Sequence, residues 1–407
     1  MIPVEEARRV VLAACPAMAP ATLPLAAALG CVTAGEVVAD ADVPSFANSA
    51  MDGFAVRAAD TAGAPVTLDV VGTAAAGSAP GVAVGPGQAV RIMTGAMVPA
   101  GADAIVMVER TTTSTSTSTC AGAGGTVRIE VGASAGDHVR HPGEDIRAGQ
   151  VLFEPGTELG PGHLGVLASV GAATVEVVPR ARVGVLSTGD ELAPAGAGLR
   201  PGQIRDSNRP MLLALVAQAG WVPVDLGSAP DDEAAITTAI ERGVSGCDAI
   251  LTSGGVSVGD FDYVKVVLDR LGNMHWWQVA VRPAKPLAFG TVGSTPVFGL
   301  PGNPVSSMVS FELFARPALR QMTGHRELFR PELPAVADEP LRRRPDGKLH
   351  LVRVVAVTDA GGRLHVRPSG GQGSHLLRAM ALANALALLP DGEGVEAGGT
   401  VKVMLLT

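Results

Sequence analysis

The residues of this chain whose types and spacing best suit chemistry lie in one stretch, Ala249-Ile-Leu-Thr-Ser-Gly-Gly-Val-Ser-Val-Gly-Asp-Phe-Asp-Tyr263. A short apolar run there precedes three glycines and two acids: Gly254, Gly255, Gly259, Asp260 and Asp262. Glycines let backbone N–H groups turn toward a bound oxyanion, and the start of a following helix adds its positive dipole end. The two aspartates favour a divalent cation beside that anion. The stretch therefore predicts a strand, a phosphate-binding loop and a helix, with a metal ion close by.

The same stretch contains Gly255-Val-Ser-Val-Gly259, which matches the G-x-S-x-G turn of serine hydrolases. A hydrolase of that class needs an acid and a histidine later in the chain. His275, His325 and His375 follow, but none stands in a triad-like setting. A serine hydrolase using Ser257 is therefore a remote alternative.

The elements that must position these residues are predicted by the alternation of apolar runs and helical patterns across residues 181–325. The strand-like runs are 183–186, 222–226 and 249–251, and the helical patterns are 209–219, 234–242 and 263–271. Such alternation predicts a parallel sheet with helices on both faces, and ligands bind outside the carboxyl ends of its strands. Asn208 and Asp231 are the predicted helix N-caps.

Polar residues follow each predicted strand at the point where it ends. Asp190 and Glu191 follow the first strand, Asp231 the second and Ser253 the third, while Asp206 precedes a helix. Because the carboxyl ends of parallel strands meet at one edge, we expect these side chains to lie close together.

Other segments add candidate ligand contacts outside this sheet. A loop carries Ser49 and Asp52 into a strand, and Thr94 stands at a strand-to-loop junction in a region of short alternating strands. Arg282 and Lys285, flanked by prolines, concentrate positive charge in an otherwise acidic protein. The Thr/Ser-rich tract 111–119 is predicted to be a solvated hairpin tip.

The composition predicts a globular chain of several domains, since 47% of its 407 residues are apolar and 17% are charged. The net charge of −8 argues against a nucleic acid or an anionic membrane surface as partner. No apolar run approaches the roughly 18 residues of a membrane span, and Glu5 and Glu6 disagree with a secretory signal. We therefore expect a cytoplasmic protein with no nucleic-acid or membrane partner.

The cysteines and one histidine pair were considered as metal ligands. Four cysteines are scattered without a C-x-x-C pair: Cys15, Cys31, Cys120 and Cys247. This pattern predicts buried free thiols in a reducing compartment. His138 and His141 stand three apart, but Pro142 breaks any helix that would align them, so we do not expect them to bind a metal ion.

Taken in order, the motifs of this chain resemble those of the bacterial MoeA family, the molybdopterin molybdenumtransferases, which are related to the E-domain of gephyrin. The resemblance covers nearly all of the chain. It rests on Asn48-Ser-Ala-Met-Asp-Gly-Phe-Ala55, Arg91-Ile-Met-Thr-Gly-Ala96, Leu186-Ser-Thr-Gly-Asp-Glu-Leu192, Asp206-Ser-Asn208, Ser253-Gly-Gly-Val-Ser-Val-Gly-Asp260, Lys285-Pro286, Leu300-Pro-Gly-Asn-Pro-Val-Ser306 and Gln372-Gly-Ser374.

The resemblance implies a multidomain α/β and β protein that forms an elongated homodimer. Its expected parts are a discontinuous linker and dimerisation domain (1–44 and 143–178), an inserted β-domain (45–142), an α/β molybdopterin-binding domain with a parallel sheet (179–326) and a barrel-like C-terminal β-domain (327–407). The active site is expected between the α/β domain of one subunit and the inserted β-domain of the other. The molybdopterin adenylyltransferase is a candidate partner.

The resemblance also implies the reaction: adenylylated molybdopterin and molybdate give the molybdenum cofactor and AMP, with Mg2+ as cofactor. Asp190, Glu191, Asp231 and Asp262 would hold Mg2+ against the phosphoanhydride. The cradle for the pterin phosphate would be Ser253, Gly254, Gly255, Ser257 and Gly259. Asp52 and Thr94 would come from the partner subunit, while Lys285, Arg282, Arg353 and Ser374 would bind molybdate. The remaining substrate contacts would be Ser49, Asp206, Asp260, Pro286, Asn303 and Ser306.

One departure from the family pattern concerns the oxyanion. The family usually has Lys-Pro-Gly-Lys-Pro, where this chain has Arg282-Pro-Ala-Lys-Pro286. Arginine keeps the charge of lysine but is larger and donates through a fork. This departure leaves one alternative, a divergent paralogue that acts with tungstate or another pterin. A second alternative, a non-catalytic scaffold, follows from the resemblance to gephyrin, which shows that this fold can also cluster partners.

Overall fold

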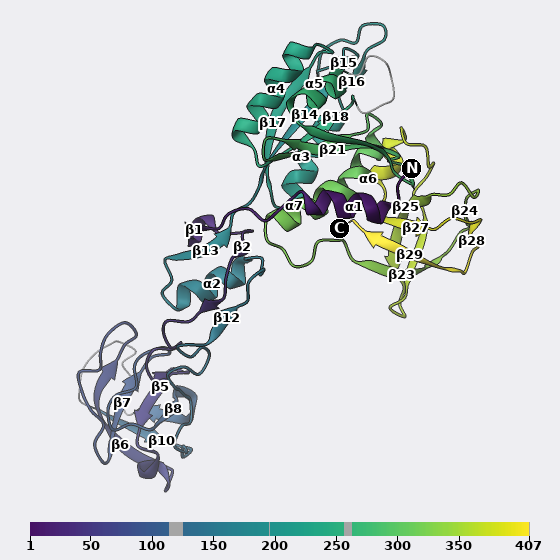
Figure 1. Ribbon diagram of the computed structural model, residues 1–407. Helices are drawn as coiled ribbons and strands as arrows, with labels where there is room; N and C mark the ends of the chain where they lie inside the picture. Colours follow the sequence, from purple (N-terminus) through teal and green to yellow (C-terminus); the bar gives the residue numbers. More distant parts are fainter. Residues whose placement is uncertain (114–124, 195, 256–262, 407) are drawn as a thin grey trace. The chain divides into compact units, whose positions relative to one another are not determined.

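The computed structural model describes residues 1–113, 125–194, 196–255 and 263–406 (Figure 1). The chain forms two compact units, one of residues 1–35, 155–160 and 176–407 and one of residues 36–154 and 161–175. The fourfold domain division stays a prediction. Residues 114–119 of the Thr/Ser-rich tract, which was predicted to be a hairpin tip, lie outside the described residues.

The first unit is built on a six-stranded sheet of order β17-β14-β18-β22-β21-β19 (Figure 1). Its strands are β14 (Arg182–Thr188), β17 (Val222–Ala229), β18 (Ala249–Ser253), β19 (Asn273–Gln278), β21 (Pro286–Val292) and β22 (Thr295–Leu300). The first four in spatial order are parallel, which confirms the predicted sheet, whereas β21 and β19 add an antiparallel extension. The sheet therefore has one edge at which the carboxyl ends of four strands meet.

Helices cover both faces of this sheet because side chains of each strand alternate between two cores. Leu251 of β18 points into a core with helix α3 (Asn208–Gln218), and its neighbour Ile250 points into a core with α4 (Glu233–Gly246) and α5 (Tyr263–Leu271). The predicted helix positions are thereby confirmed. Helix α1 (Val4–Ala13) packs with the α3 core.

Two predicted helix caps were wrong by a residue each. Asp232, not Asp231, caps α4, because the Asp232 side chain accepts a hydrogen bond from the Ala235 N–H (2.8 Å). Asn208 lies inside α3, whose N-cap position is Ser207. Both differences free a polar side chain for the carboxyl edge of the sheet.

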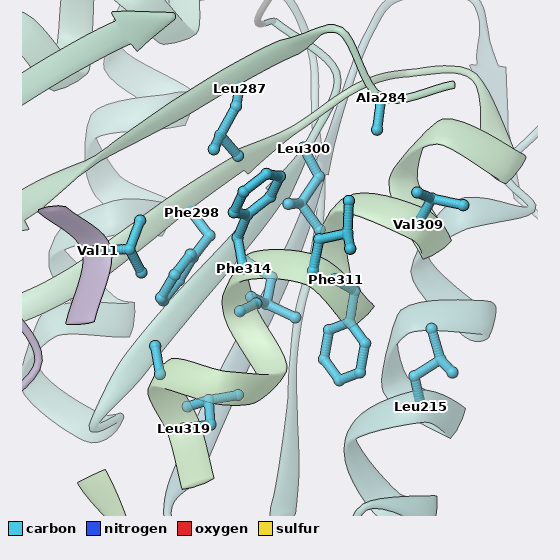
Figure 2. Packing of buried hydrophobic residues seen from close by; sticks show 14 of the residues in the cluster. Val11, Leu215, Ala284, Leu287, Phe298, Leu300, Val309, Phe311, Phe314 and Leu319 are labelled. Carbon is cyan, nitrogen blue, oxygen red and sulfur yellow. The ribbon is translucent and has the colours of Figure 1, made fainter. Parts of the chain in front are cut away.

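A long helical run follows β22 and closes the α3 core. It comprises α6 (Pro304–Ser310), a π-helical turn η4 (Phe311–Ala315) and α7 (Arg316–Met322). Figure 2 shows Phe311 and Phe314 of this run beside Phe298 and Leu300 of the sheet, with Ala284 in the same cluster. Glu312, whose side chain is fully buried, receives two hydrogen bonds from the Arg330 guanidinium.

The C-terminal part of this unit is a closed β-barrel, as the predicted fold class requires. Its sheet runs β20-β25-β26-β23-β29-β27, and β25 also pairs with β27, which closes the ring. The strands are β20 (Val281–Arg282), β23 (Glu332–Ala337), β25 (Leu349–Thr358), β26 (Leu364–Pro368), β27 (Ala385–Leu389) and β29 (Thr400–Leu405). Helix α8 (Leu377–Ala381) and the pair β24 (Leu341–Arg342) and β28 (Gly394–Val395) flank the barrel.

Smaller elements complete the first unit. They are β1 (Ala21–Pro24), η1 (Leu25–Ala27), β2 (Val32–Thr33), β13 (Thr174–Val178), β15 (Leu192–Ala193) and β16 (Ile204–Arg205). The described cysteines Cys15, Cys31 and Cys247 are buried and free, as predicted, and Cys120 lies outside the described residues. None of the helices in the described part of the chain has the length and apolarity needed to cross a membrane.

The second unit carries the predicted region of short alternating strands. Its main sheet has the order β8-β5-β7-β6-β10-β9. The elements of this unit are β3 (Val37–Val38), β4 (Asn48–Ser49), β5 (Gly53–Val56), η2 (Ala58–Thr61), β6 (Val66–Ala74), β7 (Gln88–Ile92), β8 (Ala104–Met107), η3 (Val108–Arg110), β9 (Thr111–Thr113), β10 (Thr126–Ile129), β11 (Val139–Arg140), β12 (Val151–Phe153) and α2 (Pro161–Ser169).

Candidate active site

A pocket of 210 Å3 opens at the carboxyl edge of the parallel strands. Five residues predicted from the sequence line it: Glu191, Asp206, Ser253, Gly254 and Asn303. They come from segments that follow β14, β18 and β22 or precede α3. The rule that ligands bind at the carboxyl ends of parallel strands therefore describes this pocket.

Asp206 is fixed at one wall of the pocket. Its side chain is only 5% exposed and accepts hydrogen bonds from the Ser187 hydroxyl (3.2 Å), the Arg209 N–H (3.1 Å) and the Arg209 Nε (3.1 Å). Arg209 also donates to Asp225, at 2.5 Å. A carboxylate with this many donors is held in one orientation, so it orients neighbouring groups.

Asn208 ties the end of β18 to the loop after β22. Its side-chain amide donates to the Ser253 hydroxyl (2.7 Å) and to the Gly302 carbonyl (2.6 Å). Its own Oδ1 is buried and has no hydrogen-bond partner among the described residues. Since buried polar atoms are normally paired, this oxygen is an unused acceptor in a residue that lines the pocket.

The backbone at Gly254 approaches its neighbours too closely for any other residue. Gly254 has φ +98°, and a Cβ there would lie 2.9 Å from the Thr188 carbonyl oxygen. Its N–H donates to the Leu300 carbonyl (3.2 Å), which joins the ends of β18 and β22. Gly255 also has a positive φ, +66°. These two glycines give the loop the turn that a phosphate cradle requires.

The acids that follow β14 and β17 face each other across two hydrogen bonds. The Asp231 N–H donates to the Asp190 carboxylate (3.1 Å), and the Asp190 N–H donates to the Asp231 carboxylate (3.4 Å). Glu191 is the next residue, and its carboxylate lies within 2.7 Å of where a Cβ at Gly189 would be. Asp190 and Asp231 are thus paired at the edge where the sequence predicted them, and Glu191 is their exposed neighbour in the chain.

Four predicted site residues, Ser257, Gly259, Asp260 and Asp262, lie outside the described residues. Asp262 is the fourth member of the predicted metal set. Within the part of the chain that the structure describes, no three His, Cys, Asp or Glu side chains form a group that could hold a metal ion. The described acids therefore supply only part of the ligand set that the sequence predicts.

Arg353 is the largest fully buried side chain of the described residues, with 1% exposure. Its Nη2 donates to the carbonyls of Gly371 (2.9 Å) and Gly373 (3.2 Å), and its N–H donates to the Gln372 side chain (2.9 Å). Its Nε has no hydrogen-bond partner among the described residues. Burial lowers the pKa of Arg353. A buried guanidinium whose hydrogen bonds go only to backbone carbonyls is suited to receive an anion.

The loop that Arg353 holds leads directly to the helix beside the pocket. The Val305 N–H at the start of α6 donates to the Ser374 carbonyl (3.2 Å), and the next residue of that helix, Ser306, is buried. His375, which follows Ser374, lines the pocket. Arg353, Ser374, Ser306 and Asn303 are therefore joined through one loop and one helix start.

The predicted cations near 282–286 have a different position. Arg282 lies on β20, opposite His350 of β25, and lines a separate pocket of the barrel with Gln372 and Gly373. Lys285 is exposed, and its carbonyl accepts from the Val279 N–H (2.7 Å). Pro286 begins β21. Arg282 and Arg353 thus approach the 371–374 loop from two sides, whereas the Lys285 ammonium contacts no other predicted site residue within the described ranges.

The predicted residues of the second unit form a group of their own. The Asp52 carboxylate accepts from the Thr94 N–H (2.7 Å) and hydroxyl (2.8 Å), and these two bonds lower the pKa of Asp52. The Ser49 hydroxyl donates to the Met51 carbonyl (2.5 Å). The sequence analysis paired Asp52 and Thr94 by role, and the structure brings them into direct contact.

Four pocket or loop residues were not selected from the sequence as site residues: Ser187, Asn208, Gln372 and His375. Asn208 was assigned to helix capping, Gln372 appeared only within the Gln372-Gly-Ser374 motif, and His375 only among the histidines of the hydrolase alternative. The available signal was proximity to motifs, since each lies within three residues of a selected residue.

Comparison with protein families gives three matches that together span most of the chain. Residues 2–171 match the MoeA N-terminal region (domain I and II), residues 184–321 a probable molybdopterin binding domain, and residues 335–406 the MoeA C-terminal region (domain IV).

Individual relatives agree with these matches. The chain is 42% identical over 415 residues to molybdopterin molybdenumtransferase 2 of Mycobacterium tuberculosis, covering 99% of both chains. It is 38% identical to the molybdopterin molybdenumtransferase of Haemophilus influenzae, covering 91% of this chain and 90% of the relative. Among solved structures, the MoeA protein of Pyrococcus horikoshii matches with TM-scores of 0.80 and 0.76 at 30% and 27% identity, over 99% or more of both chains.

Proposed function

Since this chain belongs to the MoeA family of molybdenum cofactor biosynthesis, we propose that it inserts molybdate into adenylylated molybdopterin and releases AMP. In this reaction water cleaves the phosphoanhydride, and two molybdate oxo groups leave as water when two dithiolene sulfurs bind molybdenum. Molybdenum stays hexavalent, so no electron donor is required. The observation that carries the proposal is the 210 Å3 pocket, because it combines carboxylates, a glycine turn and open hydrogen-bonding groups at one sheet edge.

The glycine turn and its neighbours would hold a phosphate of the substrate. Ser253 is fixed by Asn208, and Gly254 requires its turn, so the start of the loop is set before the substrate binds. Such preorganisation avoids a cost of ordering the loop during binding. Asn303 and Asp206 line the same pocket and would orient the remaining polar groups of the substrate.

Asp190, Glu191 and Asp231 would hold Mg2+, together with Asp262. These carboxylates suit Mg2+ because this ion prefers oxygen ligands and keeps several of its bound waters. When bound, the ion would neutralise charge on the phosphoanhydride. The reciprocal bonds between Asp190 and Asp231 hold these two residues together at the carboxyl edge of the sheet.

Molybdate would bind where Arg353 meets the 371–374 loop. The open Nε of Arg353 and the nearby Ser374 are donors for a tetrahedral dianion, and Arg282 and Lys285 would add positive charge. Ala284 takes a φ of +79°, a backbone conformation that glycine adopts freely. This observation supports a family-like course of the loop despite the substitution.

The assembly and surroundings belong to the same proposal. A homodimer would bring Asp52 and Thr94 of one subunit to the pocket of the other, and their mutual hydrogen bonds would present a charged, oriented carboxylate. The molybdopterin adenylyltransferase would supply the substrate. The buried free thiols of the described cysteines support a reducing, cytoplasmic location.

The decisive experiment measures AMP release from purified adenylylated molybdopterin with Mg2+, run with molybdate, with tungstate and with neither. We expect molybdate-dependent release that falls at least about a hundredfold in Glu191→Gln, the loss typical of a group that stabilises transition-state charge. Glu241→Gln is the matched control, because Glu241 is exposed on α4, away from the pocket.

Each other outcome identifies an alternative. Release with tungstate only would indicate the divergent paralogue. Tight pterin binding without release under any condition would indicate the scaffold. Labelling of Ser257 by a fluorophosphonate would support the serine hydrolase alternative.

A further inference from the structure

A pocket of 510 Å3 opens on the C-terminal barrel, apart from the one described above. Its charged lining consists of Arg282, Arg342, Arg343, Arg344, His350 and Asp346. Arginine therefore dominates this wall, although the chain as a whole carries a net charge of −8. Its volume falls within the roughly 300–1,000 Å3 of small-molecule sites.

Only some of these arginines are occupied by structural contacts. The Arg343 side chain is 1% exposed and donates to Asp346 and Asp391 and to four backbone carbonyls. Arg342 approaches Glu396 at 3.7 Å, but both side chains are about three-quarters exposed, and such pairs contribute little. Arg282 and Arg344 form no ion pair with any described residue, so their charge is available.

His350 lines the pocket close to two of its arginines, Arg282 and Arg343. Its side chain is 12% exposed, and its Nε2 lies 3.1 Å from the Asp346 carboxylate. Burial lowers the pKa of His350, and the charges of Arg343 and Arg282 lower it further, against the effect of Asp346. The guanidinium groups of Arg343 and Arg282 are therefore close enough to disfavour a proton on this ring, although burial is the larger cause of its lowered pKa.

Apart from Gln372 and Gly373, the rest of the lining is apolar. Pro283, Pro340 and Pro368 line the pocket with Leu351 and Val352. A bare inorganic ion gains nothing from such a wall, whereas an organic ring buries apolar surface against it. Guanidinium groups also stack on flat rings.

We propose that this pocket binds an organic phosphate monoester, with its dianionic phosphate on Arg282 and Arg344 and its ring against the three prolines. The ligand is a nucleoside monophosphate or a phosphorylated pterin, which share this chemistry. The pocket shares Arg282 with the proposed molybdate site, but binding is measured without turnover, so failure of this inference is distinguishable from failure of the transferase activity.

The test uses the full-length protein and 8-azido-AMP. After photolysis, we expect label on the tryptic peptides of residues 340–352, and we expect excess AMP to abolish it. Titration of labelling should give a dissociation constant that Arg344→Gln weakens at least about tenfold, the effect of losing one charge-assisted hydrogen bond. Arg363→Gln is the matched control, since Arg363 is exposed on the β25–β26 turn of the same barrel.

Competition experiments distinguish the two ligand classes, and the position of the label shows which pocket is occupied. AMP and 6-hydroxymethylpterin monophosphate should each displace the label better than inorganic phosphate, and the stronger of the two is the ligand class. Label confined to peptides of the 210 Å3 pocket, or equal displacement by inorganic phosphate, would overturn the proposal. Arg344 is an exposed surface residue, so an unchanged melting temperature is expected and confirms that any loss reflects binding.

Discussion

Ala284 offers the sharpest test of the backbone geometry beside the proposed molybdate site. It has φ +79°, in the left-handed region that disfavours a Cβ, and it is 1% exposed. Figure 2 shows its methyl group within the cluster that contains Leu300 and Val309. Replacement by glycine therefore relieves backbone strain and removes a buried methyl group at once.

The two effects have opposite signs and similar size. The left-handed conformation costs a non-glycine residue roughly 1–2 kcal/mol. The lost methyl removes about 0.8 kcal/mol of burial, and the greater freedom of glycine in the unfolded chain costs about 0.4–1 kcal/mol more. We expect Ala284→Gly to change the free energy of unfolding by less than about 1 kcal/mol.

Ala288→Gly is the matched control. Ala288 lies on strand β21, is fully buried and does not have a positive φ. It bears the same losses without the relief, so it should be destabilised by roughly 1–2 kcal/mol. Urea unfolding of both variants measures the difference. Equal destabilisation of the two would show that Ala284 stores no strain and would refute the reasoning.

Three further changes test the charges that organise the fold. Asp206→Ala should lower the free energy of unfolding by about 2–3 kcal/mol in urea titrations, because it leaves its donors unpaired; a loss below 0.5 kcal/mol would contradict its buried bonding. Glu312→Gln should cost about 3–5 kcal/mol, since it leaves the Arg330 charge buried without its partner, whereas the exposed Glu327→Gln should be near neutral. Burial and Arg320 lower the pKa of His325 against the effect of Glu158. Stability should therefore be full above pH 6.5 and fall as pH decreases below it, and His325→Gln should flatten that slope in thermal melts.

Local patterns predicted most of the α/β fold, because each strand and helix is specified by its own residues. The runs that became β14, β17 and β18, and the helices α3, α4 and α5, could be identified from periodicity and terminal residues alone. The antiparallel pair β21 and β19 was missed because strand direction depends on pairing partners, which periodicity does not encode.

The sequence predicted which residues belong to the site more accurately than which of them contact one another. Asp231 and Asp232 are adjacent acids, and the sequence cannot distinguish which one caps α4 and which one pairs with Asp190. The pairing of Asp52 with Thr94 is local to one sheet, so motif order was enough to associate the two residues. Burial of Arg353 was not predictable, since it depends on a barrel that closes around a residue usually found at the surface.

The buried Arg353 explains why the barrel matters to a site on another sheet. A guanidinium without an acidic partner is costly in a protein interior, and here carbonyls of the 371–373 loop satisfy only part of it. The same loop continues to Ser374, whose carbonyl accepts from the first turn of α6, beside the 210 Å3 pocket. An anion on Arg353 would therefore complete the bonding of the guanidinium and fix the loop at the pocket wall together. Binding of the oxyanion to the barrel would then also order the start of α6 beside the sheet, through the hydrogen bond from the Val305 N–H to the Ser374 carbonyl.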